Sequence, residues 1–184
     1  MLQSRAREKL LNSIIFFVEN TKFCGKTKLF KLLYFLDFQH YMDVGRNVSG
    51  LDYYAWPKGP VPKDLFEEFD RPDEDMTAAL DVRDGRTFDG KDMLRLTPIV
   101  PFDRKLFTKR ELRIMESLAS EYRDAYADDI IEATHLENLP WHRVYEDEGR
   151  KQELIPYEYA VRKAESDEVG KSAEEHEEFV RNYE

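Results

Sequence analysis

The segment from Thr27 to Met42, TKLFKLLYFLDFQHYM, constrains the fold more than any other part of the chain. Ten of the fourteen residues from Leu29 onward are apolar or aromatic, and they leave no continuous polar face. A helix that is apolar almost all round is buried in the protein. The segment therefore predicts a central helix that other elements cover, with Thr27 as its N-cap and Gly45 at its end.

Shorter helices are expected around this central one, because apolar residues recur three and four positions apart. Thr108 and Glu111 form a capping box, which predicts the start of a helix, and Pro140 suits the first turn of another. The expected helices cover residues 5–19, 62–69, 108–123, 129–135, a short stretch from 140, and 156–164.

The run YYAWPKGPVPKDL, residues 53–65, combines a strand-like aromatic stretch with three prolines. Residues 51–56 predict a strand, which Pro57 ends because proline cannot donate to a ladder. Gly59 predicts a backbone conformation with positive φ or a close backbone approach. We interpret the run as a strand-to-helix corner that fixes a sheet against the buried helix, with Trp56 packed on that helix.

Residues 70–100 predict a hairpin. Asp84-Gly85 and Asp89-Gly90 are dipeptides typical of hairpin turns, and residues 93–97 predict a strand. We expect this region to form one small antiparallel sheet with residues 51–56. The fold class is therefore mostly α (α+β), a single compact helical domain with a central buried helix and a small antiparallel sheet.

The charge is distributed unevenly along the chain. The 184 residues carry a net charge of -10, and residues 165–184 alone hold eight acidic and two basic residues. We expect a domain over 1–165 and an acidic C-terminal tail over 166–184, which is either solvated or a loosely held helix.

The composition also bears on localisation and partners. An acidic surface repels phosphate backbones, so nucleic-acid binding is disfavoured, apart from one basic cluster between Arg104 and Arg113. The start of the chain lacks a secretory signal, no apolar run approaches the roughly 20 residues of a membrane span, and Cys24 is the single cysteine. These features predict a cytoplasmic protein without a membrane span.

Three groups of residues have some features of chemical sites. Gly25-Lys26-Thr27 resembles the end of a phosphate-binding loop, but the position that needs the first glycine is Asn20. Glu132 and His135 have the spacing of a helix-borne metal pair, without a second pair to complete a site. Cys24 lies near two lysines that would lower its pKa, without an evident base. The expectation is no catalytic set, no metal and no cofactor, with a metal- or thiol-dependent enzyme as the alternative.

Three blocks of sequence together resemble the Panacea antitoxin domain family, which includes SocA-like antitoxins. The blocks are KLFKLLYFLDFQHYMDVGR (28–46), YYAWPKGPVP (53–62) and THLENLPW (134–141). The family pattern is a helix with Lys-Leu-x-Lys-Leu-Leu-Tyr-Phe, a Trp-x-x-Gly-Pro corner, and Thr-His before Pro-Trp. The resemblance spans about residues 5–165. The matching structural positions are Lys31, Tyr34, Trp56, Gly59, Pro60, Thr134, His135, Pro140 and Trp141.

The resemblance implies a binding protein. Panacea domains neutralise unrelated, often phage-associated toxins by direct protein–protein contact, and a SocA-like antitoxin can also deliver its toxin to a protease. The implied partner is a cognate protein toxin, basic, and acting on RNA, nucleotides or replication. The motif residues are implied to be structural, and the partner-binding residues do not carry over. An autoregulatory DNA-binding protein is a further alternative.

Overall fold

The structure is a computed structural model that describes residues 5–86, 90, 92–136 and 139–161. The expected tail at 166–184 and the end of the expected last helix lie outside these residues. The elements in chain order are α1 (Arg5–Asn20), α2 (Lys26–Val44), β1 (Tyr54–Trp56), β2 (Gly59–Val61), α3 (Lys63–Glu68), α4 (Glu74–Ala79), β3 (Leu80–Arg86), β4 (Asp92–Pro98), η1 (Arg104–Leu106), α5 (Lys109–Glu121), α6 (Ala127–Thr134), α7 (Pro140–His142), η2 (Arg143–Asp147) and η3 (Tyr157–Ala160).

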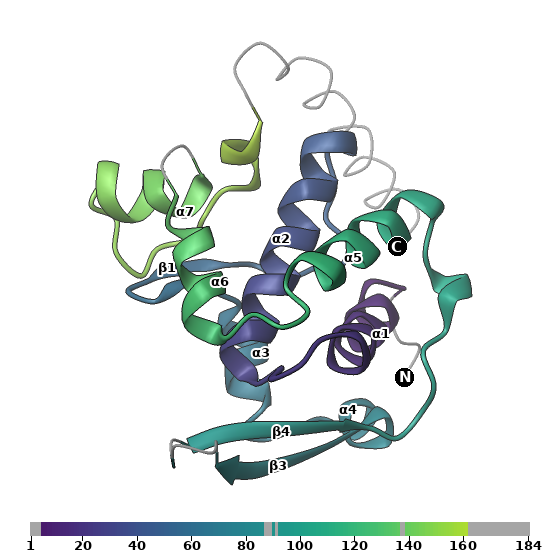
Figure 1. Ribbon diagram of the computed structural model, residues 1–184. Helices are drawn as coiled ribbons and strands as arrows, with labels where there is room; N and C mark the ends of the chain where they lie inside the picture. The colour runs from purple at the N-terminus through teal and green to yellow at the C-terminus, as the bar shows by residue number, and fades with distance from the viewer. Residues whose placement is uncertain (1–4, 87–89, 91, 137–138, 162–184) are drawn as a thin grey trace.

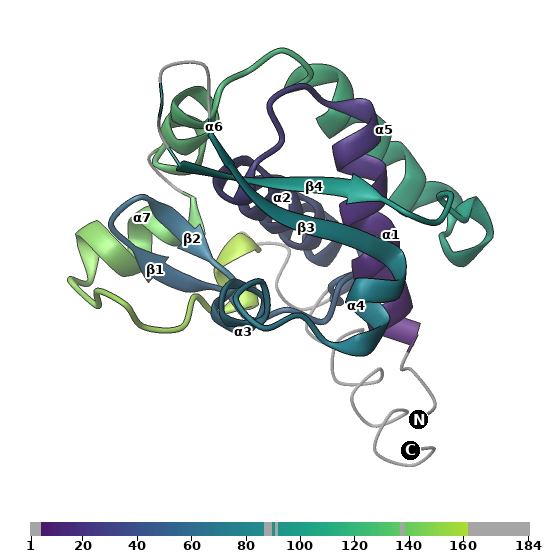
Figure 2. The ribbon, with the colours of Figure 1, turned by 90° about the horizontal axis from the view of Figure 1, so that it is seen from below.

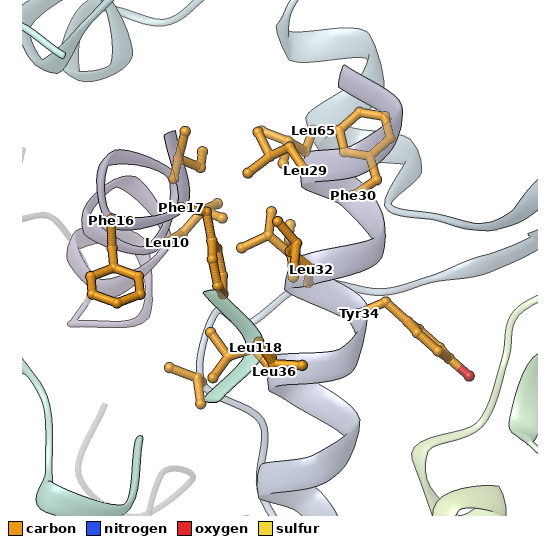
Figure 3. Close-up of a cluster of buried hydrophobic side chains, with 14 of the residues drawn as sticks. Leu10, Phe16, Phe17, Leu29, Phe30, Leu32, Tyr34, Leu36, Leu65 and Leu118 are labelled. Atoms are coloured by element: carbon orange, nitrogen blue, oxygen red, sulfur yellow. The ribbon is translucent and has the colours of Figure 1, made fainter. Parts of the chain in front are cut away.

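Helix α2 is the centre of the fold, which confirms the prediction from its apolar surface (Figure 1). One side of α2 packs on α1 and α5, where Leu32 and Leu36 lie close to Phe17 and Leu118 (Figure 3). Tyr34 leaves the opposite side of the helix, toward the hairpin, α6 and η3 (Figure 3). Helix α2 thus contributes side chains to the core on both of its sides.

The start of α2 differs from the prediction. Gly25, not Thr27, is the N-cap, and the helix begins at Lys26, whose side chain lies 3.6 Å above the Phe66 ring and donates to the Phe66 carbonyl oxygen. The preceding element is helix α1, so the strand that a phosphate-binding loop requires is replaced by a helix. Gly45 ends α2 with a φ of +69°, as predicted.

One acidic side chain within α2 fixes the segment that follows the helix. The buried Asp37 carboxylate accepts hydrogen bonds from the backbone N–H groups of Val48 and Ser49, at 2.8 and 2.9 Å, and from the Tyr53 hydroxyl at 2.8 Å. Burial raises the pKa of Asp37, and these hydrogen bonds oppose that shift. The carboxylate therefore holds the approach to β1 against the central helix.

The β-structure consists of two separate ribbons, so the expectation of one shared sheet is wrong. β1 pairs with β2, with Trp56 opposite Gly59, and the run with three prolines is therefore a hairpin that leads into α3. The other edge of β1 is covered by residues 152–155, which exchange backbone hydrogen bonds with Tyr53 and Ala55. Both edges of β1 are hydrogen-bonded, one to β2 and the other to residues 152–155, which leaves no edge for a third strand from residues 93–97.

β3 and β4 form the second ribbon, which lies across one end of the helical body with β4 against α1 (Figure 2). Gly85 lies inside β3, opposite Met93, so the prediction of a turn at Asp84-Gly85 is wrong. Gly90 has a φ of +81°, in the connection between the two strands. The sequence signal for a turn occurs twice within seven residues, and only the second coincides with the connection between the strands.

The capping box at the start of α5 is confirmed. The Thr108 hydroxyl accepts from the backbone N–H of Glu111, and the Glu111 carboxylate accepts from that of Thr108. The same carboxylate pairs with Lys9 of α1, so the cap also joins two helices. Among the helices of the described residues, none has both the length and the apolar character needed to cross a membrane.

Candidate functional site

The three sequence blocks of the predicted motif meet at one joint between α2, the β1–β2 hairpin, α6 and α7. Lys31 and Tyr34 come from α2, and Trp56, Gly59 and Pro60 come from the hairpin. The other members are Thr134 at the end of α6, His135 at its C-cap, and Pro140 and Trp141 in α7. We call this set of nine residues the motif joint.

Lys31 connects the central helix to the hairpin. Its side chain is 1% exposed, and its ammonium donates a 2.7 Å hydrogen bond to the Pro60 carbonyl oxygen. Burial lowers the pKa of Lys31 to about 7, because the charged form loses its hydration. A long cationic side chain is thus placed in the interior to hold one backbone carbonyl.

Gly59 is where the hairpin comes closest to both helices. Its φ is +93°, as the sequence predicted, and a Cβ atom there would lie 2.7 Å from the Thr134 Oγ1 and 3.0 Å from the Lys31 Cε. Both distances are shorter than ordinary van der Waals contacts. Glycine is therefore required by its backbone angle and by its neighbours together.

Trp141 closes the joint on its far side. The ring is 2% exposed, and its Nε1–H donates to the Trp56 carbonyl oxygen at 3.0 Å. The His135 ring stacks on one face with ring centroids 3.9 Å apart, and the Tyr145 ring stacks on the other face at 4.7 Å. Pro140 occupies the first turn of α7, as predicted, and positions the ring.

Trp56 contacts the helix that follows the hairpin. Its ring is half-buried and packs on Phe66 of α3, with ring centroids 5.2 Å apart. Gly59, its partner across the hairpin, faces Lys31 of α2. The contact of Trp56 with the rest of the joint runs through its carbonyl oxygen.

Two polar atoms in the joint are buried without a hydrogen-bond partner among the described residues, the Tyr34 hydroxyl and the His135 Nε2. Burial raises the pKa of Tyr34, and it lowers the pKa of His135, with the positive charge of Lys31 adding to the second shift. Both groups are therefore neutral near pH 7. The joint is therefore a contact between helices and the hairpin in which polar side chains are packed in the interior.

Cys24 and His135, two residues of the enzyme alternative, lie near opposite ends of α6. Cys24 lies in the α1–α2 connection, beside the start of α6, whereas His135 caps the other end of α6. The eight residues of α6 span about 12 Å. Burial raises the pKa of the Cys24 thiol to about 11 and outweighs the lowering by the positive charge of Lys28, so the predicted net lowering of this pKa is wrong.

A different group of carboxylates, missed in the sequence, has the spacing of a metal site. Among the described residues, Glu68, Asp73 and Asp75 bring one oxygen each within 4.8 Å of the others. Arg7 donates hydrogen bonds to both Glu68 and Asp75, and these contacts raise the pKa of Arg7. The arginine compensates part of the negative charge of this cluster and links α1 to α3 and α4.

The basic cluster of the DNA-binding alternative is partly neutralised. Arg104 forms an ion pair with Glu116 at 2.9 Å, and Arg110 lies 3.7 Å from Asp43. Charges that are paired with carboxylates contribute little to the counterion release that drives phosphate binding. The cluster is therefore a weaker phosphate-binding surface than its sequence indicates.

Comparison with protein families decides the affiliation of the chain. The family model "Antitoxin SocA-like, Panacea domain" matches residues 29–142. The chain belongs to this family. All nine residues of the motif joint lie within the matched range of the Panacea domain, whereas α1 and the segment after His142 lie outside it. No curated protein and no solved structure matches the chain.

Proposed function

We propose that the protein is an antitoxin that neutralises a cognate toxin by direct protein–protein binding. The observation that carries the proposal is the match of residues 29–142 to the SocA-like Panacea family, which favours a binding role over a catalytic one. The proposed partner is a basic protein toxin that acts on RNA, nucleotides or replication.

The motif joint acts in this proposal as a scaffold. Lys31 and Trp141 direct their polar groups to the carbonyl oxygens of Pro60 and Trp56, and Gly59 lies within the contact distance of two helices. These contacts fix the hairpin, α6 and α7 on the central helix. The shared residues of the family then build the body of the domain, and the surface around it contacts the toxin.

The net charge of -10 supports the choice of a basic partner. An acidic surface attracts a basic protein over distances up to the Debye length and raises the rate of association. We expect the association rate to fall as NaCl is raised to about 0.5 M, where the Debye length is about 4–5 Å, with a smaller change in the dissociation rate.

Co-expression with the neighbouring reading frame tests the proposal. The expected result is that the neighbouring gene arrests growth when expressed alone, that this protein restores growth, and that the two copurify as a stoichiometric complex. An unfolded variant, Gly59→Ala combined with Trp141→Ala, serves as the control that must not restore growth. If the intact protein neither binds the neighbouring product nor restores growth, the antitoxin proposal is wrong.

Delivery of the toxin to a protease is an extension of the same proposal. It predicts that toxin abundance falls in cells that contain the antitoxin, whereas simple blocking leaves abundance constant and lowers only toxicity. Immunoblots of the toxin after synthesis is stopped distinguish the two outcomes.

The division of the chain at residue 165 is part of the proposal as well. Because the motif joint and the elements packed on it lie before this point, deletion of 166–184 is expected to leave the melting temperature and the growth rescue unchanged. Loss of rescue by a folded truncated protein would assign the acidic tail a part in binding.

A further inference from the structure

Two aromatic rings project into solvent side by side on the surface of the protein. Phe23 is 51% exposed and Tyr126 is 62% exposed. Their rings stack with centroids 4.7 Å apart and planes 17° apart. Phe23 lies in the α1–α2 connection and Tyr126 directly before α6, and we call the pair the Phe23–Tyr126 platform.

The backbone holds Phe23 in a strained conformation. Its φ is +55°, in the left-handed region that L-residues with a Cβ adopt at a cost. A strained residue is retained where it contributes to the core or to function. Because the Phe23 ring is half-exposed, its partial burial offsets only part of the gain that full burial would give, and the exposed half leaves room for a contact outside the core.

A buried lysine makes the platform rigid. The Lys28 side chain is 0% exposed, and its ammonium donates to the carbonyl oxygens of Lys22 at 2.8 Å and Ala125 at 2.7 Å, with a longer contact to that of Arg123 at 3.5 Å. The backbone N–H of Lys22 also donates to the Arg123 carbonyl oxygen at 2.8 Å. The two connections that carry the rings are thus fixed to one helix, which lowers the entropy lost on binding.

The charges around the rings are mostly negative. Asp128, Asp129 and Glu132 of α6 are exposed. The exposed bases beside the platform are Arg123 and Lys22, and Lys22 pairs with Asp124 at 2.6 Å. Burial lowers the pKa of Lys28, while the negative charges of Asp124 and Asp129 oppose that shift. Stacked aromatic rings with a carboxylate rim disfavour a nucleotide, whose phosphates the rim repels, and favour a cation.

We propose that the Phe23–Tyr126 platform is the docking site for an arginine side chain on the basic surface of the toxin. A guanidinium group is planar, stacks on aromatic faces, and forms paired hydrogen bonds with carboxylates. A lysine ammonium is a point charge that neither stacks in this way nor forms the paired hydrogen bonds. Exposed aromatic residues and arginine are also the residue types that dominate binding hot spots. The proposal rests on the antitoxin function and adds the surface and the chemistry of the contact.

The first test compares variants in binding to the purified product of the neighbouring gene. Phe23→Ala combined with Tyr126→Ala is expected to weaken binding about tenfold or more, mainly through faster dissociation. The control replaces Ile99 and Val100 by alanine, a second exposed apolar pair at 57% and 40% exposure, and is expected to bind like the wild type. If wild type restores growth and the platform variant binds equally well, the platform proposal fails while the antitoxin function stands.

Phe23→Gly separates binding from folding. Glycine adopts a positive φ without strain, so this variant is expected to melt at a higher temperature than the wild type while it binds the toxin more weakly. A lower melting temperature would mean that the ring stabilises the fold, and would overturn the proposal.

A second test is independent of the neighbouring gene. Two synthetic peptides of one sequence, with arginine or with lysine at every basic position, are titrated into the protein while the aromatic NMR signals of Phe23 and Tyr126 are followed. The arginine peptide is expected to bind several-fold more tightly and to shift these signals, and the double alanine variant is expected to lose the difference. Equal affinity of the two peptides for the wild type, or unchanged aromatic signals, would overturn the platform proposal. This outcome does not depend on whether the protein is an antitoxin.

Discussion

Gly59→Ala is the substitution whose effect the structure specifies most closely. The backbone angle of +93° costs an alanine about 1–2 kcal/mol, the penalty of the left-handed region. The new Cβ would also lie 2.7 Å from the Thr134 Oγ1 and 3.0 Å from the Lys31 Cε, and overpacking of this kind costs about 1–3 kcal/mol. The smaller conformational freedom of alanine in the unfolded chain offsets about 0.4–1 kcal/mol.

The expected net loss in the free energy of unfolding is therefore about 1–4.6 kcal/mol. For a chain of 184 residues, each kcal/mol lowers the melting temperature by about 2–4 °C. Calorimetry gives the melting temperature, and urea unfolding followed by tryptophan fluorescence gives the free energy, since Trp56 and Trp141 both belong to the joint.

Gly149→Ala is the matched control. This residue has a φ of +64° and nothing within 4 Å of a built Cβ, so it reports the backbone cost alone, about 1 kcal/mol. The double variant Gly59→Ala with Thr134→Ala removes the closest atom and is expected to regain about 1 kcal/mol. If Gly59→Ala costs no more than Gly149→Ala, the close approach of Lys31 and Thr134 does not constrain the hairpin, and the reasoning about the joint is refuted.

Three further predictions concern the joint and the protein as a whole. Trp141→Ala is expected to cost about 3–5 kcal/mol in urea unfolding because its ring is fully buried, and the half-buried Trp56 is expected to cost less; equal losses would contradict this. The free energy of unfolding is expected to rise from pH 7 toward about pH 9. Lys31 has a pKa of about 7 in the folded protein and releases its proton over this range, whereas the unfolded chain keeps it. The Lys31→Met variant should show a flatter pH dependence, and an unchanged slope would be contrary evidence. Extensive dialysis against a chelator is expected to leave the melting temperature unchanged, since Arg7 already pairs with two of the three carboxylates of the cluster. A fall restored by a divalent cation would reveal a metal site.

The parts of the fold that sequence predicts are those with a local signal. The central helix follows from the apolar surface of residues 29–42, the start of α5 from Thr108 and Glu111, and the positive φ of Gly59 from its place among prolines. The partner of β1 was predicted wrongly because strand pairing depends on edges, and residues 152–155, distant in sequence, already cover one of them.

The candidate site was also predicted only in part from the sequence. The sequence identified the members of the motif joint, and the structure added how Lys31 and Trp141 reach the hairpin carbonyls. The buried contacts of Asp37 and Lys28 were missed, although a charged residue inside an otherwise apolar helix is a signal for a buried polar contact. The stacking of Phe23 on Tyr126 has no such signal, because the two rings are brought together by connections about a hundred residues apart in the chain.

The way in which Lys28 is held bears on how the protein can evolve. All three oxygen atoms that its ammonium contacts belong to the main chain, at Lys22, Arg123 and Ala125. Every amino acid carries such an oxygen, so the side chains of both connections can be exchanged by mutation while the clamp persists, provided that the connections keep their lengths. The clamp thus depends on Lys28 and on the paths of the two main chains, so substitutions in either connection change the surface offered to a partner without removing the clamp.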